Sequence, residues 1–222
     1  MTSTAVLLSA GLDSAVLAAA EARTSRVHPI YVSAGLAWEA GELTVLERLL
    51  SGPPFQGRLM PLTRLSFAVA DVYPPTHWAI RGEPPAFDTP DEDVYLVGRN
   101  IALVSKTAIY CARHKVHRIA LAPLAGNPFP DATPEFFNAI SRALSLGLAH
   151  DIVIDAPFAS MQKSDVIRLG LELGVPLELT LSCMNPDEHR HCGRCSKCRE
   201  RRDAFHEAGI VDPTVYATAP LR

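Results

Sequence analysis

The chain has 222 residues, of which 48% are hydrophobic and 20% are charged, and its formal net charge is -3. These values are typical of a globular protein with a substantial core, and they predict no stable binding to nucleic acid or to an anionic membrane. No stretch reaches the ~18 uninterrupted apolar residues that span a bilayer. The first apolar run is not preceded by Lys or Arg and is interrupted by Asp13, unlike a signal peptide, so we expect a cytoplasmic protein.

Apolar periodicity and turn residues divide the chain into alternating strands and helices. The pattern predicts strands over 6–8, 27–32, 58–62, 118–122 and 151–154. It predicts helices over 14–22, 38–50, 98–114, 134–146, 163–173 and 197–208. Residues 66–93 are rich in proline and have little periodicity, which indicates a long loop or insertion, either a lid or disordered.

This alternation predicts an α/β fold with a doubly wound, mainly parallel sheet and helices on both faces. In such folds the ligand binds beyond the carboxyl ends of the strands. Residues 9–14 follow the first predicted strand and therefore belong to the expected site.

The stretch Ser9-Ala10-Gly11-Leu12-Asp13-Ser14 combines a glycine, two hydroxyls and a carboxylate. Backbone N–H groups at a helix start suit phosphate oxygens, and a carboxylate can hold Mg²⁺ beside them. The lysine of a Walker A loop is absent. The residues alone leave two interpretations open: a phosphate-binding loop, or a strand–turn–helix capped by Asp13.

Four of the five cysteines crowd together as Cys183-x8-Cys192-x2-Cys195-x2-Cys198, with Gly193 as the turn residue. Such spacing is typical of a structural Cys₄ zinc site, while an iron–sulfur cluster is the alternative that spacing alone leaves open. We expect His189 and His191 to be solvated rather than to bind the metal. The many Arg and Lys side chains nearby are expected to neutralise the thiolates. Cys111 is expected to be a buried apolar residue.

The loop resembles the PP-loop of the ATP pyrophosphatases, and later motifs resemble the 7-cyano-7-deazaguanine synthase (QueC) family within that superfamily. These motifs are 97–100 (VGRN), 163–170 (KSDVIRLG), 176–183 ending in Cys183, and 192–199 (CGRCSKCR). The resemblance extends from residue 5 to about 213, with a weak region at 35–95. It implies a PP-loop ATP-binding domain over 1–180 and a zinc-binding knuckle with a C-terminal helix over 181–222, packed on the same domain.

The resemblance also implies an activity. ATP would adenylate the carboxylate of 7-carboxy-7-deazaguanine, ammonia would form the amide, and a second ATP-dependent step would give the nitrile. ATP, Mg²⁺ and a structural Zn²⁺ are implied, as is a homodimer. Asp13, Lys163 and Arg99 would be catalytic. The nucleotide would contact Leu8, Ser9, Ala10, Gly11, Leu12, Asp13, Ser14, Gly98, Arg99 and Asn100, and the deazapurine would contact Asp131, Glu135 and Phe136.

Two departures from the family pattern bear on the substrate. Ala10 stands where the family usually has Gly, and a methyl group there is compatible with the loop if φ stays negative, although it crowds the phosphate pocket. Residues 127–133 also lack the family's Cys-Arg pair, since Ala132 and Thr133 replace it. The alternative is therefore a divergent PP-loop enzyme that activates another carboxylate or uses another acceptor, including a tRNA, a nucleobase or a protein.

Overall fold

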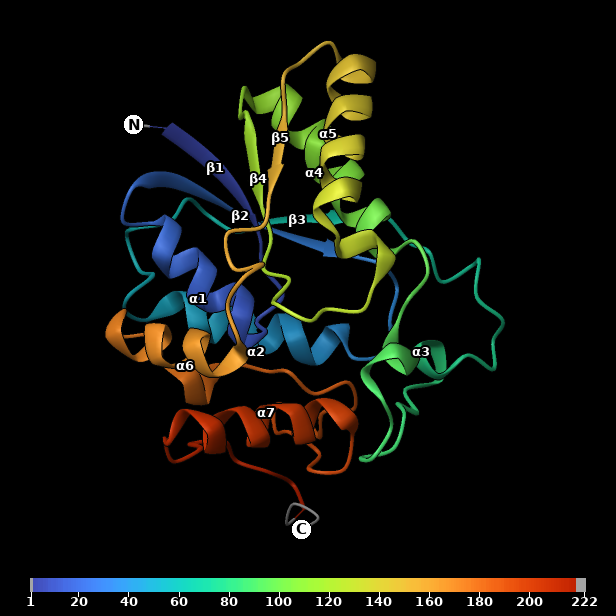
Figure 1. Ribbon diagram of the computed structural model, residues 1–222, viewed down its shortest axis with the longest axis vertical. Coiled ribbons are helices and arrows are strands. Elements are labelled where there is room, and N and C mark those ends of the chain that lie inside the picture. The colour runs from blue at the N-terminus through green and yellow to red at the C-terminus, as the bar shows by residue number, and fades with distance from the viewer. Residues whose placement is uncertain (1, 219–222) are drawn as a thin grey trace.

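A computed structural model describes residues 2–218 of the chain (Figure 1). The strands are β1 (Thr2–Leu7), β2 (Ser25–Ser33), β3 (Thr63–Ser66), β4 (Arg118–Ala120) and β5 (Val153–Asp155). The helices are α1 (Leu12–Glu21), α2 (Glu39–Ser51), α3 (Trp78–Arg81), α4 (Arg99–His114), α5 (Pro134–Leu148), α6 (Lys163–Glu172) and α7 (Ser196–Ala208).

The strands of the described residues form one sheet in the order β3-β2-β1-β4-β5, with every pair parallel. The chain first winds outward from β1 through β2 to β3, then crosses back to β4 on the other side of β1. The strand order therefore reverses between β1 and β4. A crevice forms at this position outside the carboxyl ends of the strands, so it is the expected place for a ligand.

Helices cover both faces of the sheet, which explains why the carboxyl halves of β1 and β2 are buried on both sides. One core packs α1, α2 and α6 against the sheet, and it includes Leu17, Leu46 and Ile167. The other packs α4 and α5, and it includes Ala108 and Phe137. The doubly wound α/β fold predicted from the sequence is confirmed.

Helix α7 forms a further layer below α6 (Figure 1). Its Phe205 belongs to the same buried cluster as Leu12 of α1, together with the four clustered cysteines. The division of the chain at residue 180 stays a prediction, but the two parts share one core.

Most predicted elements occur within a few residues of their expected bounds, and the third strand is the exception. Residues 58–62 do not form a regular strand, because the chain turns through Gly57 with φ of 74° and Leu59 makes an isolated bridge to Val27. Strand β3 begins only at Thr63.

The insertion at 66–93 contains the short helix α3 and otherwise has no regular helix or strand apart from the start of a 3₁₀ turn at Asp91–Val94. It is ordered against the rest of the molecule, because Trp78 of α3 stacks on Trp38 with ring centroids 5.6 Å apart. Of the two alternatives for this segment, the structure does not support disorder, and its action as a lid stays a prediction. Among the described residues, no helix is both long and apolar enough to cross a membrane.

Candidate functional site

The loop between β1 and α1 leaves the first N–H groups of α1 free. Gly11 is the N-cap residue, and no side chain caps the helix. The Ser14 hydroxyl instead donates to the Gly11 carbonyl at 3.0 Å and accepts from the Ser9 N–H at 3.3 Å. Asp13 lies within the first turn, so the interpretation of Asp13 as the N-cap is wrong. The uncapped helix start is suited to an anion.

Ala10 departs from expectation, because its φ is +63° rather than negative. This left-handed conformation favours glycine, which explains why glycine suits this position. The Ala10 side chain is fully buried in the core with Leu12 and does not line the site cavity, so it does not crowd the phosphate pocket. Its carbonyl accepts a hydrogen bond from the Leu181 N–H at 2.9 Å, which anchors this conformation.

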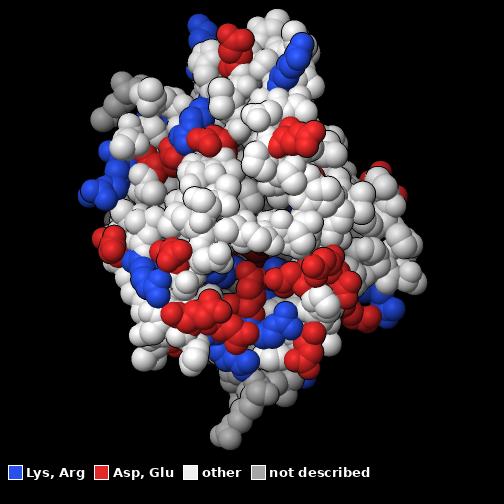
Figure 2. Space-filling model, viewed as in Figure 1, with Lys and Arg blue, Asp and Glu red and all other residues white. Residues whose placement is uncertain are grey.

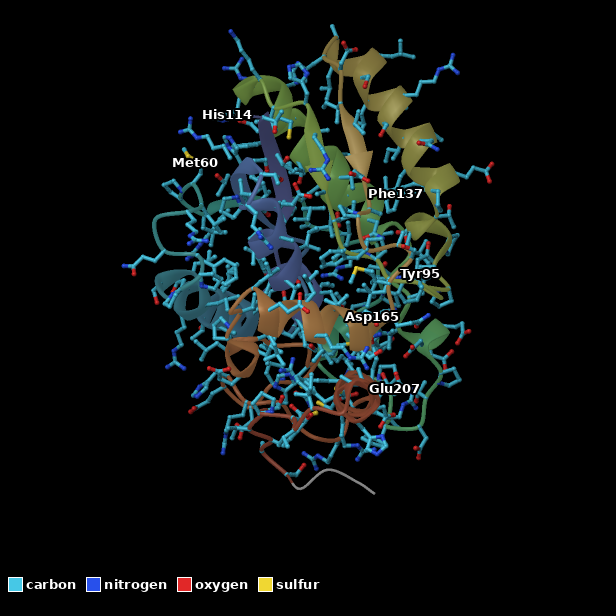
Figure 3. All side chains as sticks on the ribbon, turned by 60° about the vertical axis from the view of Figure 1, so that its left-hand side comes forward. Met60, Tyr95, His114, Phe137, Asp165 and Glu207 are labelled. Atoms are coloured by element: carbon cyan, nitrogen blue, oxygen red, sulfur yellow. The ribbon has the colours of Figure 1, made fainter. Side chains whose placement is uncertain are left out.

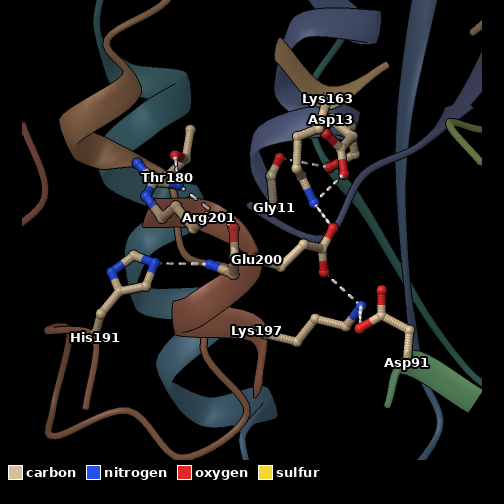
Figure 4. Close-up of polar contacts among 11 residues, drawn as sticks. Gly11, Asp13, Asp91, Lys163, Thr180, His191, Lys197, Glu200 and Arg201 are labelled. Carbon is tan, nitrogen blue, oxygen red and sulfur yellow. Dashed lines mark hydrogen bonds and ion pairs between the residues drawn. The ribbon is translucent and has the colours of Figure 1, made fainter. Parts of the chain in front are cut away.

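Asp13 belongs to a row of alternating charges that connects three parts of the fold (Figure 4). Its Oδ2 lies 3.2 Å from Lys163 Nζ at the start of α6, and Lys163 also forms a short ion pair with Glu200 of α7. Glu200 in turn pairs with Lys197 at 2.6 Å, and Lys197 Nζ lies 3.8 Å from Asp91 of the insertion. The structure thus brings the predicted Asp13 and Lys163 together.

Burial and pairing shift the pKa values of these groups. Burial raises the pKa of Asp13, although Lys163 opposes this. For Glu200, burial favours the neutral acid, but Lys163 and Lys197 outweigh it and lower the pKa to about 2. Asp13 Oδ1 is buried and has no hydrogen-bond partner among the described residues, which leaves it available to a cation.

A cavity of about 260 Å³ opens at the reversal point of the sheet, beside the loop. Tyr95 is one of its lining residues and lies, in the view of Figure 3, between Phe137 of the core and Glu207 of α7. The other residues come from the ends of the strands, the starts of α1 and α4, helix α2, the turn before α4 and the loop after β4. They include Leu8, Ser9, Asp13, Ser14, Tyr31, Glu42, Arg99, Asn100, Phe129 and Asp131.

Two oppositely charged side chains face this cavity away from the loop. Arg99 begins α4, and its Nε is buried without a hydrogen-bond partner among the described residues. Glu42 of α2 is 7% exposed and accepts a hydrogen bond of 3.1 Å from the Tyr31 hydroxyl. Burial raises the pKa of Glu42 to about 7, an effect that the nearby Arg99 partly offsets.

The sequence interpretation missed Glu42 because it considered only the apolar positions of this helix. A signal was present, since Glu42 shares the spacing of the buried Val45, Leu46 and Leu49. A single carboxylate within an apolar helical stripe is a buried ionisable group, and such groups gather at functional sites.

Asn100 lines the cavity, and Asp131 holds it through both its backbone N–H and its side-chain amide N–H group. The Asn100 N–H donates to Asp131 Oδ2 at 3.1 Å, and Nδ2 donates to the Asp131 carbonyl at 3.0 Å. These bonds fasten the loop after β4 to the start of α4. Glu135 is exposed and Phe136 packs towards the α4–α5 core, so neither is among the cavity-lining residues.

The four clustered cysteines form a candidate metal site. Cys183, Cys192, Cys195 and Cys198 are all buried, and their sulfur atoms lie within 4.8 Å of one another. Gly193 makes the turn with φ of +79°, where a Cβ would lie 2.5 Å from the Thr218 carbonyl oxygen. Backbone N–H groups, including those of Cys192 and Arg194, donate to the sulfur atoms.

Arg199, Arg201 and His191, which lie near this site, are held by other parts of the fold. Arg199 donates to the carbonyls of Phe87 and Thr89 in the insertion, so it holds the insertion to α7. Arg201 is 1% exposed and donates to Thr180. His191 is 3% exposed, and its expected solvation is therefore wrong.

Acidic and basic side chains lie interspersed across the lower half of the face shown in Figure 2. Much of the rest of this face is uncharged. Because the two signs are mixed, this face has no extended basic surface, which agrees with the net charge of -3.

The sheet order, the uncapped loop at the reversal point and the C-terminal cysteine cluster define a doubly wound α/β protein with a candidate anion site and a candidate metal site. A family model described as queuosine biosynthesis protein QueC matches residues 3–209. The chain therefore belongs to the QueC family.

Curated relatives named 7-cyano-7-deazaguanine synthase match nearly the whole chain. The relative from Methanopyrus kandleri is 33% identical, over 97% of this chain and 99% of its own length. The relative from Methanothrix thermoacetophila is 35% identical, over 95% and 96%. The relative from Anaeromyxobacter dehalogenans is 33% identical, over 96% and 94%. These names indicate an enzyme of the synthase kind that acts on small molecules.

Among solved structures, the U34-tRNA thiolase NcsA from Methanococcus maripaludis superposes with a TM-score of 0.49 and 11% identity, covering 95% of this chain and 74% of that chain. This likeness is too distant to bear on the reaction.

Proposed function

We propose that the chain converts 7-carboxy-7-deazaguanine and ammonia to 7-cyano-7-deazaguanine at the expense of ATP. The observation that carries this proposal is the juxtaposition, in one cavity, of the uncapped α1 start with Asp13 and of Arg99 with Glu42. The full-length similarity to the named synthases supports the same activity.

The loop side of the cavity suits the phosphates of ATP. The free N–H groups at the start of α1 and the Ser9 hydroxyl would bind phosphate oxygens, while Ser14, whose proton is donated to the Gly11 carbonyl, would hold the loop in shape. Asp13 Oδ1, buried and unpartnered among the described residues, fits a Mg²⁺ ligand. Mg²⁺ would neutralise charge on the phosphates, and Lys163 would stabilise the charge that develops at the α-phosphate.

The opposite side of the cavity suits a deazaguanine. Its base presents N–H donors at one edge, and the buried Glu42 is an acceptor already oriented by Tyr31. The unpartnered Nε of Arg99 is suited to hold the carboxylate that is activated. Asp131, fixed by Asn100, would complete this wall, while Glu135 and Phe136 would act only indirectly.

In the proposed reaction the substrate carboxylate attacks the α-phosphorus of ATP, and pyrophosphate leaves. Ammonia then attacks the acyl carbon and displaces AMP, which gives the amide. The amide oxygen then attacks the α-phosphorus of a second ATP and displaces pyrophosphate. AMP leaves with that oxygen, and the two N–H protons of the amide are released, which gives the nitrile. The residues of the chain contribute by holding the two substrates in line and by stabilising charge in a partly closed cavity.

Zinc is the metal that we propose for the cysteine cluster. Sulfur atoms of Cys183 and Cys195, and of Cys192 and Cys198, lie 3.9 Å apart, and those of Cys195 and Cys198 lie 3.5 Å apart. A tetrahedron with Zn–S bonds of about 2.3 Å has sulfur–sulfur edges of about 3.8 Å. A cubane cluster needs wider spacing, because each thiolate binds a different iron. Metal analysis tests this assignment. A zinc protein should contain zinc and show no absorption in the visible range, whereas an iron–sulfur protein would absorb there.

The function is tested by incubating the purified chain with 7-carboxy-7-deazaguanine, ammonia and Mg·ATP and measuring nitrile by mass. We expect nitrile formation, and we expect Asp13→Ala to lower its rate at least about 100-fold while the exposed Glu172→Ala leaves it unchanged. Folded protein with its metal that forms no nitrile would rule the proposal out. Pyrophosphate exchange driven by another carboxylate would then favour the divergent enzyme.

A further inference from the structure

Glu200 lies outside the sequence motifs that indicate nucleotide binding. It is nevertheless connected to the loop between β1 and α1 by one side chain, that of Lys163. It belongs to α7, whose N-cap is Cys195 and whose first turn carries Cys198. Its carboxylate forms the short ion pair with Lys163, whose Nζ also lies 3.2 Å from Asp13 Oδ2 (Figure 4). Lys163 is 15% exposed and Glu200 is 25% exposed, so solvent screens this contact only partly.

A second set of contacts fixes α7 relative to the loop. The Leu181 N–H donates to the Ala10 carbonyl at 2.9 Å. The residues on either side of Leu181 form hydrogen bonds with side chains of the C-terminal segment. Arg201 Nη1 donates to Thr180 Oγ1 at 2.8 Å, while the Ser182 N–H donates to His191 Nε2 at 3.1 Å. The place of Glu200 beside Lys163 is therefore determined by buried bonds rather than by the ion pair alone.

Lys163 needs a partner other than Asp13, because Asp13 has a second role in the proposed function. In the proposed function Asp13 binds Mg²⁺, and a carboxylate that binds a divalent cation attracts a neighbouring ammonium group less strongly. Without Glu200, Lys163 would then have only a weakened partner and a flexible side chain of four methylene groups. Glu200 has a second contact that orients it, because its other oxygen accepts a hydrogen bond from Lys197 Nζ at 2.6 Å.

We propose that Glu200 is a positioning residue, which holds the Lys163 ammonium group at the phosphate loop while Asp13 is engaged by the metal of Mg·ATP. It thereby couples the helix that carries the cysteine cluster to the nucleotide site. This inference rests on the proposed function, because it takes the loop as the ATP site.

The test measures binding of a non-hydrolysable ATP analogue with Mg²⁺ by calorimetry, without any deazapurine. We expect Glu200→Gln, which keeps the shape and removes the charge, to weaken binding about 10- to 100-fold, as loss of a partner to a functional group commonly does. Glu207→Gln is the matched control, since this exposed side chain lies on the same helix. Metal content and thermal unfolding verify that each variant is folded.

A double-mutant cycle separates positioning from a general structural effect. If Glu200 acts through Lys163, Glu200→Gln changes binding by less than about twofold in a Lys163→Gln background. If Glu200→Gln does not fold, Glu200→Asp keeps the charge and withdraws it from Lys163, and it should weaken binding as well.

Unchanged nucleotide binding by a folded Glu200 variant, or an equal loss in Glu207→Gln, would overturn the assignment. An effect that persists in full in the Lys163→Gln background would also overturn it. If the unaltered chain does not bind the analogue at all, the ATP site itself is wrong, which distinguishes the failure of the proposed function from the failure of this inference.

Discussion

Single residues at the loop and the cavity have conformations or positions that lower the stability of the fold. Ala10 adopts a φ of +63°, in a region that costs a residue with a Cβ about 1–2 kcal/mol. Glu42 places a carboxylate in a position that is 7% exposed. Both costs are compensated by their surroundings, and each gives a measurable consequence.

We expect substitutions of Ala10 to follow the strain of its backbone. Ala10→Gly relieves the left-handed conformation but loses a buried methyl group and makes the unfolded chain more flexible, so the free energy of unfolding should change by less than about 1 kcal/mol. Ala10→Val adds a β-branched side chain at positive φ and should cost more than about 2 kcal/mol and abolish nucleotide binding. Denaturant unfolding and calorimetry measure both. A well-folded Ala10→Val that binds nucleotide would contradict the loop conformation.

Glu42 should make stability depend on pH. Burial raises its pKa to about 7 from the ordinary value of 4.5, so the folded protein binds the proton more tightly than the unfolded chain. Its contribution is fully present below about pH 4.5 and is lost as the pH rises through about 7, by roughly 3 kcal/mol. Glu42→Gln should therefore stabilise the protein at pH 8 and not at pH 4. Unfolding curves at both pH values decide this, and an equal effect at both would show that Glu42 is not buried as a neutral acid.

At the scale of elements, small residues determine how closely α1 and α6 approach each other. A Cβ at Gly170 of α6 would lie 2.8 Å from Val16 Cγ2 of α1 and 3.0 Å from Leu177 Cδ2. Because Lys163 begins α6 and Asp13 lies in α1, this close contact also fixes the distance between the two charged groups of the loop.

We expect Gly170→Ala to destabilise the protein by about 1–3 kcal/mol, because the added methyl group has no space. Gly147→Ala is the matched change in α5, where a Cβ meets no atom within 4 Å in the described part of the chain. It should be neutral or stabilise by up to about 1 kcal/mol, since alanine favours helix. Thermal unfolding of the pair measures the difference, and equal values would show that α1 and α6 are not in this contact.

At the scale of the whole molecule, the cysteine cluster, α7 and the loop between β1 and α1 form one connected unit. The four cysteines lie in the same buried cluster as Leu12 at the start of α1. The ordered insertion is attached to this unit through Arg199 and the carbonyls of Phe87 and Thr89. Loss of the metal should therefore affect more than the knuckle.

We expect Cys195→Ser to release the metal, to lower the melting temperature by about 10 °C or more and to weaken nucleotide binding together with it. A structural metal site contributes several kcal/mol, and 1 kcal/mol corresponds to about 2–4 °C in a chain of this size. Cys111→Ala is the control, because this buried thiol lies in the α4–α5 core and should keep the metal content unchanged. Metal analysis, thermal unfolding and calorimetry are the measurements. Full nucleotide affinity in metal-free protein would show that the two sites are independent.

The sequence by itself determined the alternation of strands and helices, the start of α4 at Arg99 and the four cysteines of the metal site. These features depend on local periodicity and spacing, which neighbouring residues along the chain define. It misplaced β3, because one turn at Gly57 displaces the pairing by several residues.

Only the tertiary structure decided the conformation of Ala10 and the partners of the charged side chains. The positive φ of Ala10 is anchored by Leu181, and Asp13 pairs with Lys163 of α6, which in turn pairs with Glu200 of α7. Glu42 becomes part of the site only when α2 places it under the carboxyl end of β2, beside Tyr31. Contacts between residues far apart in the chain depend on how the layers pack, and no local pattern specifies them.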